Sequence, residues 1–293
     1  MGYLYLGLAL AGGLIKGFAG KRISKEVLTF RDCLLANLLR FLFCAVFSAV
    51  LLWINGESFD FSLENLPFYL FSAVCMDAYC ITFMYGYKTT AYMFLSIFGM
   101  LGSAITALLG HFIYSESLSP GKIAGMVLLV GAVAVMSKYN KKVTLTDTAR
   151  LLPLLILATV SVALSDFTQK VYAYEIGGSA GIYNFNTYAY AAVLVLIALL
   201  GTNLCAGKQA VMPVWNKYFL LYPATAGAQF LNSFSKTLAA KTLPAAEIYP
   251  VLQGANLIAS AVLASVLLKE PISKRCILGM ALAFAGILLM KLC

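Results

Sequence analysis

Long apolar runs follow one another along most of this 293-residue chain. Each run is long enough to cross the hydrocarbon core of a bilayer as an α-helix, which needs about 20 residues. Transmembrane strands need only about ten residues of alternating polarity, so a barrel is excluded. The runs span residues 3–20, 30–54, 66–86, 91–113, 121–138, 151–172, 180–201, 217–238, 245–268 and 273–291. The sequence therefore predicts an all-α membrane protein with ten transmembrane helices.

The composition supports the same class of protein. Hydrophobic residues make up 61% of the chain and charged residues only 11%, with a mean hydropathy of +0.87. Soluble globular proteins carry about 25% charged residues, so a soluble enzyme is excluded. The net charge of +9 is expected to reflect basic cytoplasmic loops, and no nucleic-acid partner is predicted. A single histidine and seven cysteines without a CxxC pair predict no metal site and no cofactor.

The chain also contains an internal repeat. Shifting residues 91–136 forward by 154 positions aligns Glu116 with Glu270, Gly125 with Gly279, and Met136 with Met290. Shifting the first helix by 149 positions aligns Phe18 with Phe167 and Lys21 with Lys170. Each copy then has five helices, an odd number, so the second copy must enter the membrane from the opposite side. We predict two inverted five-helix repeats, residues 1–140 and 141–293, an architecture typical of secondary transporters with a midplane site.

Basic residues are distributed unequally between the two faces of this predicted bundle. Loops after odd-numbered helices, with their flanks, hold 14 Lys and Arg, whereas even-numbered loops and the tails hold 4. The positive-inside rule places the basic loops in the cytoplasm and both termini outside. The chain opens directly into its first apolar run without a basic leader, so no cleaved signal peptide is expected.

The ends of the two halves resemble a known family. Each half closes with a small-residue helix, an acid-containing turn and a glycine-punctuated final helix, in the segments Leu95–Met136 and Tyr249–Met290. With two five-helix halves, this pattern resembles the drug/metabolite transporter superfamily and its EamA-type, ten-helix bacterial branch. The resemblance implies a multi-pass transporter in a bacterial plasma membrane with termini inside, opposite to the charge count. The first helix departs from the family at Lys16–Ser24, where a Trp/Gly-rich apolar stretch is usual.

Charged side chains inside membrane spans are costly, so each is a candidate for function. Asp77 is the only acid at mid-depth. It is interpreted as a proton-coupling carboxyl or the partner of a substrate ammonium, with a structural acid as the alternative. Arg40 is predicted to clamp an anionic group, to pair with Asp77, or to snorkel toward the cytoplasm. Lys16 and Lys236 lie about one turn from helix ends, where they either bind substrate or snorkel.

The remaining charged and small residues of the spans are interpreted chiefly as structural. Asp166 and Glu247 lie near helix ends. The residues assigned to interfaces and turns are Lys21, Lys170, Glu116 and Glu270. Small residues such as Gly99, Gly102 and Gly125 are predicted to allow close packing of helices and not to contact substrate.

Uncharged polar residues form stripes on three of the predicted helices. They share a face at spacings of three, four and seven residues: Tyr183, Asn186 or Thr187, and Tyr190; Gln229, Asn232 and Lys236; and Tyr249, Gln253 and Asn256. Unpaired amides are costly against lipid, so the stripes are expected to face inward. They predict a wet central cavity with tyrosine faces for stacking; hydrogen bonding between helices is the alternative.

The leading functional prediction is a secondary transporter that moves a small polar metabolite by alternating access. Three deep cations, Lys16, Arg40 and Lys236, outnumber Asp77 and favour an amino acid or an organic anion as substrate. The alternatives are an exporter of organic cations or drugs that uses Asp77, and, remotely, an intramembrane lipid-modifying enzyme. An enzyme is not predicted, because no HExxH motif or second histidine is present. The expected partners are substrate, membrane lipid and a proton or counter-substrate, with the chain a monomer or homodimer.

Overall fold

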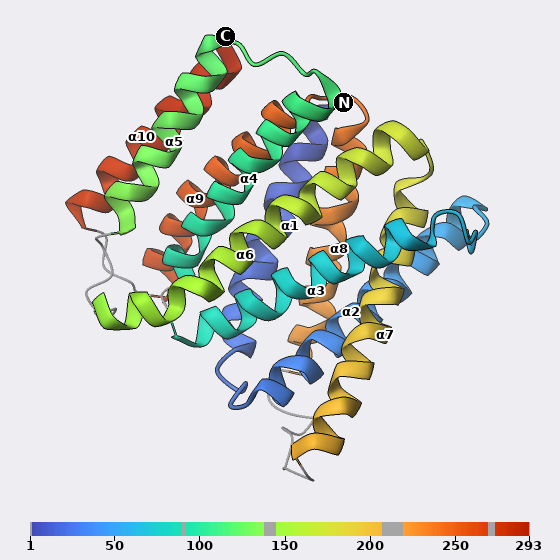
Figure 1. Cartoon of the computed structure of the whole chain (residues 1–293). Helices are drawn as coiled ribbons and strands as arrows, with labels where there is room; N and C mark the ends of the chain where they lie inside the picture. Colours follow the sequence, from blue (N-terminus) through green and yellow to red (C-terminus); the bar gives the residue numbers. More distant parts are fainter. Residues whose placement is uncertain (1, 90–91, 138–144, 207–218, 269–272, 293) are drawn as a thin grey trace.

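A computed structural model describes residues 2–89, 92–137, 145–206, 219–268 and 273–292 (Figure 1). These residues form ten α-helices and a short π-helical turn. The elements are α1 (Gly2–Ile23), α2 (Phe30–Asn55), α3 (Leu66–Thr89), α4 (Tyr92–Tyr114), α5 (Pro120–Ser137), α6 (Leu145–Val171), η1 (Tyr172–Ile176), α7 (Ala180–Ala206), α8 (Leu221–Ala240), α9 (Ala245–Leu268) and α10 (Lys274–Leu292). The all-helical class predicted from the apolar runs is therefore confirmed.

Local sequence signals explain several helix ends. The Thr29 side chain accepts the Asp32 N–H at 3.2 Å, and the Asp32 carboxylate accepts the Thr29 N–H at 2.8 Å. This reciprocal capping box satisfies two backbone donors that would otherwise be unpaired at the start of α2. The same helix ends at Asn55 and is capped by Gly56, whose φ of +65° is a left-handed conformation that glycine adopts without strain. The largest boundary difference is α6, which begins at Leu145 because polar residues extend the helix beyond its apolar run.

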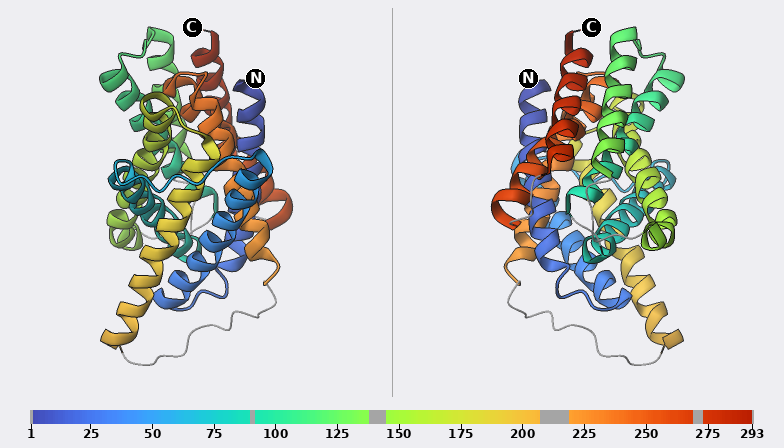
Figure 2. Two further views of the ribbon diagram at one scale, coloured as in Figure 1. Left: turned by 90° about the vertical axis from the view of Figure 1, so that its right-hand side faces the viewer. Right: turned by 90° about the vertical axis from the view of Figure 1, so that its left-hand side faces the viewer.

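The helices run back and forth between two ends of the molecule. The start of α1, the end of α10 and the turns 115–119 and 241–244 lie together at one end (Figures 1 and 2). We call this end the termini face. The turn between α1 and α2 lies at the opposite end, as the odd-numbered turns of an up-and-down bundle must.

Helices from the two halves of the chain pack on one another throughout the bundle. α1 packs on α8 and α3 on α6, while α2 packs on α7, α4 on α9 and α5 on α10. In the predicted repeat, each helix of the first half corresponds to the helix numbered five higher. Exchanging every helix for its counterpart turns the α1–α8 contact into the α6–α3 contact. The same exchange leaves the α2–α7, α4–α9 and α5–α10 contacts unchanged. This packing is what a pseudo-two-fold relation would produce. The inverted repeat and its boundary at residue 140 stay predictions.

Membrane-length apolar helices are present among the described residues. Four are both long enough and apolar enough to cross a membrane: Gly2–Ile23, Phe30–Asn55, Leu66–Gly86 and Ala180–Thr202. Large apolar side chains also face outward, including Val46, Phe71 and Ile197. Such a surface suits lipid better than water. That all ten helices span the membrane remains a prediction.

Two glycines set the close approach of α5 and α10. A Cβ atom added at Gly125 would lie 2.6 Å from the carbonyl oxygen of Gly286, which is closer than real contacts allow. We expect Gly125→Val to force these helices apart and to lower the free energy of unfolding by about 1–3 kcal/mol. Thermal unfolding in detergent measures the loss. Gly131→Val is the matched control on the same helix, because a Cβ at Gly131 meets nothing within 4 Å; equal losses for both variants would contradict this packing.

Candidate functional site

A polar cavity lies between helices of both halves. A water molecule's centre can occupy about 60 Å³ of it, several times the 10–15 Å³ that one water needs. The cavity is lined from α1, α3, α4, α6, α8 and α9. Its polar and charged lining residues are Lys16, Tyr79, Ser165, Asp166, Gln229, Asn232, Lys236, Gln253 and Asn256. Met76, Phe83, Val162 and Leu252 add an apolar part to the wall.

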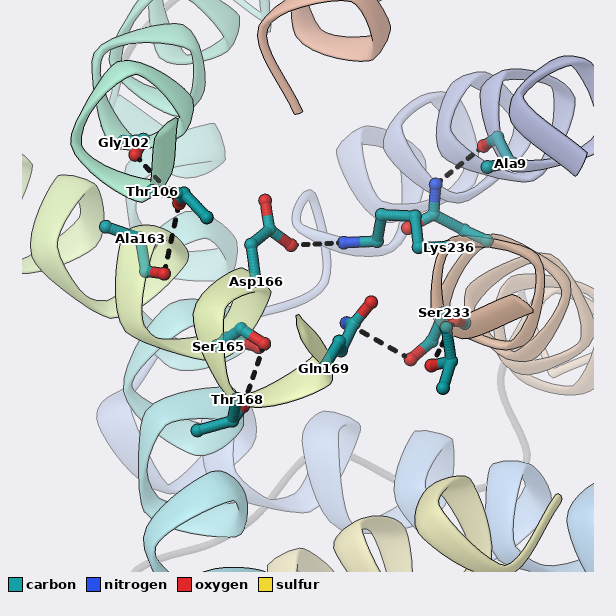
Figure 3. A network of polar contacts seen from close by, with 12 residues as sticks. Ala9, Gly102, Thr106, Ala163, Ser165, Asp166, Thr168, Gln169, Ser233 and Lys236 are labelled. Atoms are coloured by element: carbon teal, nitrogen blue, oxygen red, sulfur yellow. Dashed lines mark hydrogen bonds and ion pairs between the residues drawn. The ribbon is translucent and has the colours of Figure 1, made fainter. Parts of the chain in front are cut away.

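An ion pair crosses the cavity wall from α8 to α6. The Lys236 ammonium donates to Asp166 Oδ1 (Figure 3). Both residues are buried, with 7% and 2% of their surfaces exposed. A buried lysine without a partner carries a large desolvation penalty, so each charge of this pair requires the other. The pair therefore links α6 to α8, two helices of the second predicted repeat.

A second cation, Lys16 on α1, has no such partner. Its ammonium donates to Asn232 Oδ1 at 3.2 Å and lies 5.1 Å from the centre of the Tyr79 ring. The amide of Asn232 is itself fixed by donation to the Ala9 carbonyl at 2.6 Å. No ion pair of Lys16 occurs within the described part of the chain. Two lysines and one aspartate therefore line the cavity, which carries a net charge of +1.

Several buried acceptors at or beside the cavity lack a hydrogen-bond donor among the described residues. They are Asp166 Oδ2, Gln229 Oε1 and Gln169 Oε1. The Gln229 amide is held by donation to Met76 Sδ and Tyr188 Oη, each at 3.5 Å. Gln169, one turn after Asp166, donates to Ser233 at 3.5 Å (Figure 3). Buried acceptors that lack a partner are costly, so they indicate a place where a bound group donates.

Charged contacts also join the two halves at the termini face. Lys170 pairs with Glu116 at 2.8 Å and donates to the Leu243 carbonyl at 3.1 Å. The other oxygen of Glu116 accepts the Ala245 N–H at 2.7 Å. Nearby, Lys122 pairs with Glu247 at 3.2 Å, and the Tyr3 hydroxyl donates to the same carboxylate at 3.1 Å. These contacts tie α4, α5 and α1 to α6 and α9. The predicted turn residue Glu270 lies outside the described residues.

The structure brings half of the predicted site residues together. Six of the twelve line the cavity: Lys16, Gln229, Asn232, Lys236, Gln253 and Asn256. The α8 stripe reaches the cavity completely, and the α9 stripe does so at two of its three positions. Tyr249, the third, is fully buried without lining the cavity, and its hydroxyl has no hydrogen-bond partner.

The α7 stripe lies elsewhere because α7 packs at the outside of the bundle, on α2 and α3. Tyr183 is hydrogen-bonded to Ser72 at 2.6 Å and Thr168 at 3.0 Å, within a buried cluster of hydroxyl groups. Asn186 donates to the Ile182 carbonyl of its own helix. Tyr190 packs against apolar neighbours. For this stripe the structure supports hydrogen bonding and packing between helices.

Beyond this hydroxyl cluster, the aromatic rings of Tyr183, Tyr172 and Tyr69 pack together toward the loop 56–65. Tyr69 donates to the Asp60 carboxylate at 3.0 Å. Asp60 also accepts the Ser62 N–H at 2.9 Å, and this backbone hydrogen bond holds the pKa of the Asp60 carboxyl below its usual value. The three rings thus pack α3, η1 and α7 against one another.

The two remaining predicted residues lie outside the cavity lining. Arg40 is buried on α2, which packs on α7 and α8. Asp77 is 9% exposed, and its Oδ1 has no hydrogen-bond partner in the part of the chain that the structure describes. No ion pair between Arg40 and Asp77 is present within the described ranges, so the predicted pairing of these two residues is not seen.

Asp166 is the main cavity residue that sequence reasoning did not select. Its position near a helix end suggested a structural role, but its carboxylate faces the cavity beside Lys236. The repeat contains the missing signal. The shift of 149 positions that aligns the first and sixth helices places Lys16 on Ser165 and Gly17 on Asp166, and all four line the cavity. Gly99, which was assigned to helix packing, also lines it.

An all-helical bundle with membrane-length apolar helices supports a multi-pass membrane protein, and its helices surround a charged polar cavity. Residues 4–138 match the EamA-like transporter family, part of the drug/metabolite transporter superfamily. The family resemblance predicted from the sequence is thereby confirmed, and the matched segment coincides with the first predicted repeat. This match and the apolar helices support a multi-pass membrane protein and suggest a transporter of the drug/metabolite type.

The fold is shared with proteins of known structure. A solved structure titled "Crystal structure of protein" is similar with a TM-score of 0.72, at 14% identity over 96% of each chain. At this identity the similarity shows the fold alone. No curated protein matches the sequence.

Proposed function

We propose that the chain is a secondary transporter that moves a small polar metabolite, an amino acid or an organic anion, by alternating access through the central cavity. The unpaired Lys16 ammonium carries this proposal. Within a cavity where Asp166 already neutralises Lys236, it leaves one positive charge for an anionic group of the substrate. Directional hydrogen bonds from the amides of Gln253 and Asn256 would add specificity.

Two inverted repeats in ten membrane spans would supply the movement. The cavity lies between helices of residues 1–140 and 141–293, where rocking one half against the other exposes it to each side in turn. Energy would come from exchange or from an ion gradient, with Asp77 as a candidate proton carrier because its buried carboxyl has an unpartnered oxygen. The membrane would be a bacterial plasma membrane. The distribution of basic residues favours termini outside the cell, whereas the family resemblance implies termini in the cytoplasm.

The ion pairs of the termini face would close the cavity on that side. We expect Glu116→Gln to weaken this closure, because Lys170 then loses the carboxylate that holds α6 against the α4–α5 turn. A cysteine placed at Ser165, in the cavity wall, reports the opening. Its rate of alkylation by a membrane-impermeant maleimide applied from the termini face should rise severalfold. Glu64→Gln, in the exposed loop 56–65, is the control; an unchanged rate in the Glu116 variant would contradict the assignment.

Binding and transport by the purified protein test the proposal directly. Detergent-solubilised protein is screened by thermal shift against amino acids, organic anions, nucleotides and quaternary amines. A ligand at a hundredfold excess over its Kd stabilises the folded state by about 2.7 kcal/mol. Compounds that bind are then tested for counterflow in proteoliposomes. Hits among anions or amino acids, transported by the wild type, are expected. Hits confined to amines and lost in Asp77→Asn would instead establish a cation exporter.

A further inference from the structure

The cavity brings a cation without an ion pair and two buried acceptors without a donor, among the described residues, into one site. We propose that the substrate is an amino or hydroxy acid, whose anionic group binds Lys16 and whose N–H or O–H donor binds Asp166 Oδ2 and Gln229 Oε1. This inference rests on the proposed transport function and narrows its substrate class. A carboxylic acid without an amino or hydroxyl group can pair with Lys16 but has no donor for Asp166 and Gln229.

Asp166 provides the strongest acceptor. A carboxylate has two oxygens that accept from several directions, and Lys236 uses Oδ1 only. Oδ2 is buried without a donor, and Figure 3 shows it directed away from the Lys236 ammonium. The residue is 2% exposed and lines the cavity. A donor on the ligand would remove the cost of leaving this charged oxygen unpaired.

Gln229 extends the same acceptor surface from α8. Its amide nitrogen is engaged by Met76 and Tyr188, which leaves Oε1 buried and without a donor. Both Asp166 and Gln229 line the cavity. A carboxylate group would be repelled from these oxygens, whereas an ammonium or hydroxyl group can donate to them.

Lys16 supplies the cation for the anionic group of the substrate. Of its three ammonium donors, one is directed to Asn232 Oδ1 at 3.2 Å. The face of the Tyr79 ring lies beside the ammonium and stabilises its charge. A carboxylate bound here gains a charge-assisted hydrogen bond, while the apolar wall at Met76, Phe83 and Leu252 can take an aliphatic side chain.

A matched series of ligands isolates the donor. Leucine, 2-hydroxy-4-methylpentanoate and 4-methylpentanoate share a carbon skeleton and a carboxylate but differ at the second carbon; 3-methylbutylamine lacks the carboxylate. Binding to the purified full-length protein is measured by calorimetry. We expect the amino or the hydroxy acid to bind at least about tenfold more tightly than 4-methylpentanoate, which corresponds to one charge-assisted hydrogen bond. The amine is expected to bind no better than the plain acid.

A double variant separates recognition from folding. Asp166→Leu with Lys236→Met removes the acceptor and its ion-pair partner together, so no charge is left unpaired. The preference for the donor-bearing acids should then fall below about threefold, while the affinity for 4-methylpentanoate is retained. Equal binding of all three acids by the wild type would overturn the inference and leave anion transport standing. If none of the four ligands binds or is transported, both this inference and the proposed substrate class fail.

Discussion

Lys236→Met is expected to destabilise the protein more than any other single change in the cavity. The substitution leaves the Asp166 carboxylate buried without its cation, in a wall where that residue is 2% exposed. Removal of one partner from a buried ion pair costs about 3–5 kcal/mol in proteins where this has been measured. Thermal unfolding of the purified variant in detergent measures the loss.

The double variant Asp166→Leu with Lys236→Met should recover most of that stability, because apolar side chains of similar volume replace a buried pair at little cost. Lys241→Met serves as the control, since this lysine is exposed directly after α8 and donates to the Gly178 carbonyl. Additive losses in the double variant would show that Lys236 and Asp166 do not act as a pair.

Lys16→Met is expected to abolish tight substrate binding while leaving the fold intact. No carboxylate partner of Lys16 is orphaned, and the methionine side chain can occupy the space of the lysine stem. The bound anionic group loses a charge-assisted hydrogen bond, which corresponds to a loss of about 10- to 100-fold in affinity. Transport by proteoliposomes at subsaturating substrate should fall by the same factor.

Lys25→Met provides the comparison, because this lysine lies in the turn after α1 and outside the cavity lining. Its affinity and transport should equal those of the wild type. If the Lys16 variant unfolds at the wild-type temperature and binds substrate with wild-type affinity, then Lys16 does not bind the substrate.

The helices were predictable because hydropathy alone determines where a chain can cross a bilayer. The predicted runs and the observed elements agree within a few residues, and even the break at Gly56 follows from a local turn signal. These features depend on local composition and spacing, which the sequence contains explicitly.

Only some of the residues that line the cavity could be predicted. The spacing of polar residues shows which face of a helix is polar, but it does not show which other helix packs against that face. The stripe of Gln229, Asn232 and Lys236 faces the cavity because α8 packs on α1 near its centre. An equally polar stripe on α7, at Tyr183, meets the hydroxyl groups of Ser72 and Thr168 instead. The depth of a charged residue within its own helix also did not identify Asp166 as a site residue. Asp166 belongs to the cavity wall together with its ion-pair partner Lys236, which lies on another helix.

A variant that fills the cavity tests the central claim that substrate binds there. Gly99 lines the cavity, and a Cβ at this position would meet its nearest neighbour, Gln253 Oε1, at an ordinary 3.7 Å. Gly99→Leu therefore places a larger side chain in the cavity without breaking a described ion pair; Gly131→Leu, in open space on α5, is the control. Counterflow of the identified substrate in proteoliposomes is the measurement. We predict that transport is lost in the first variant and retained in the second; transport with unchanged affinity in Gly99→Leu would contradict the account.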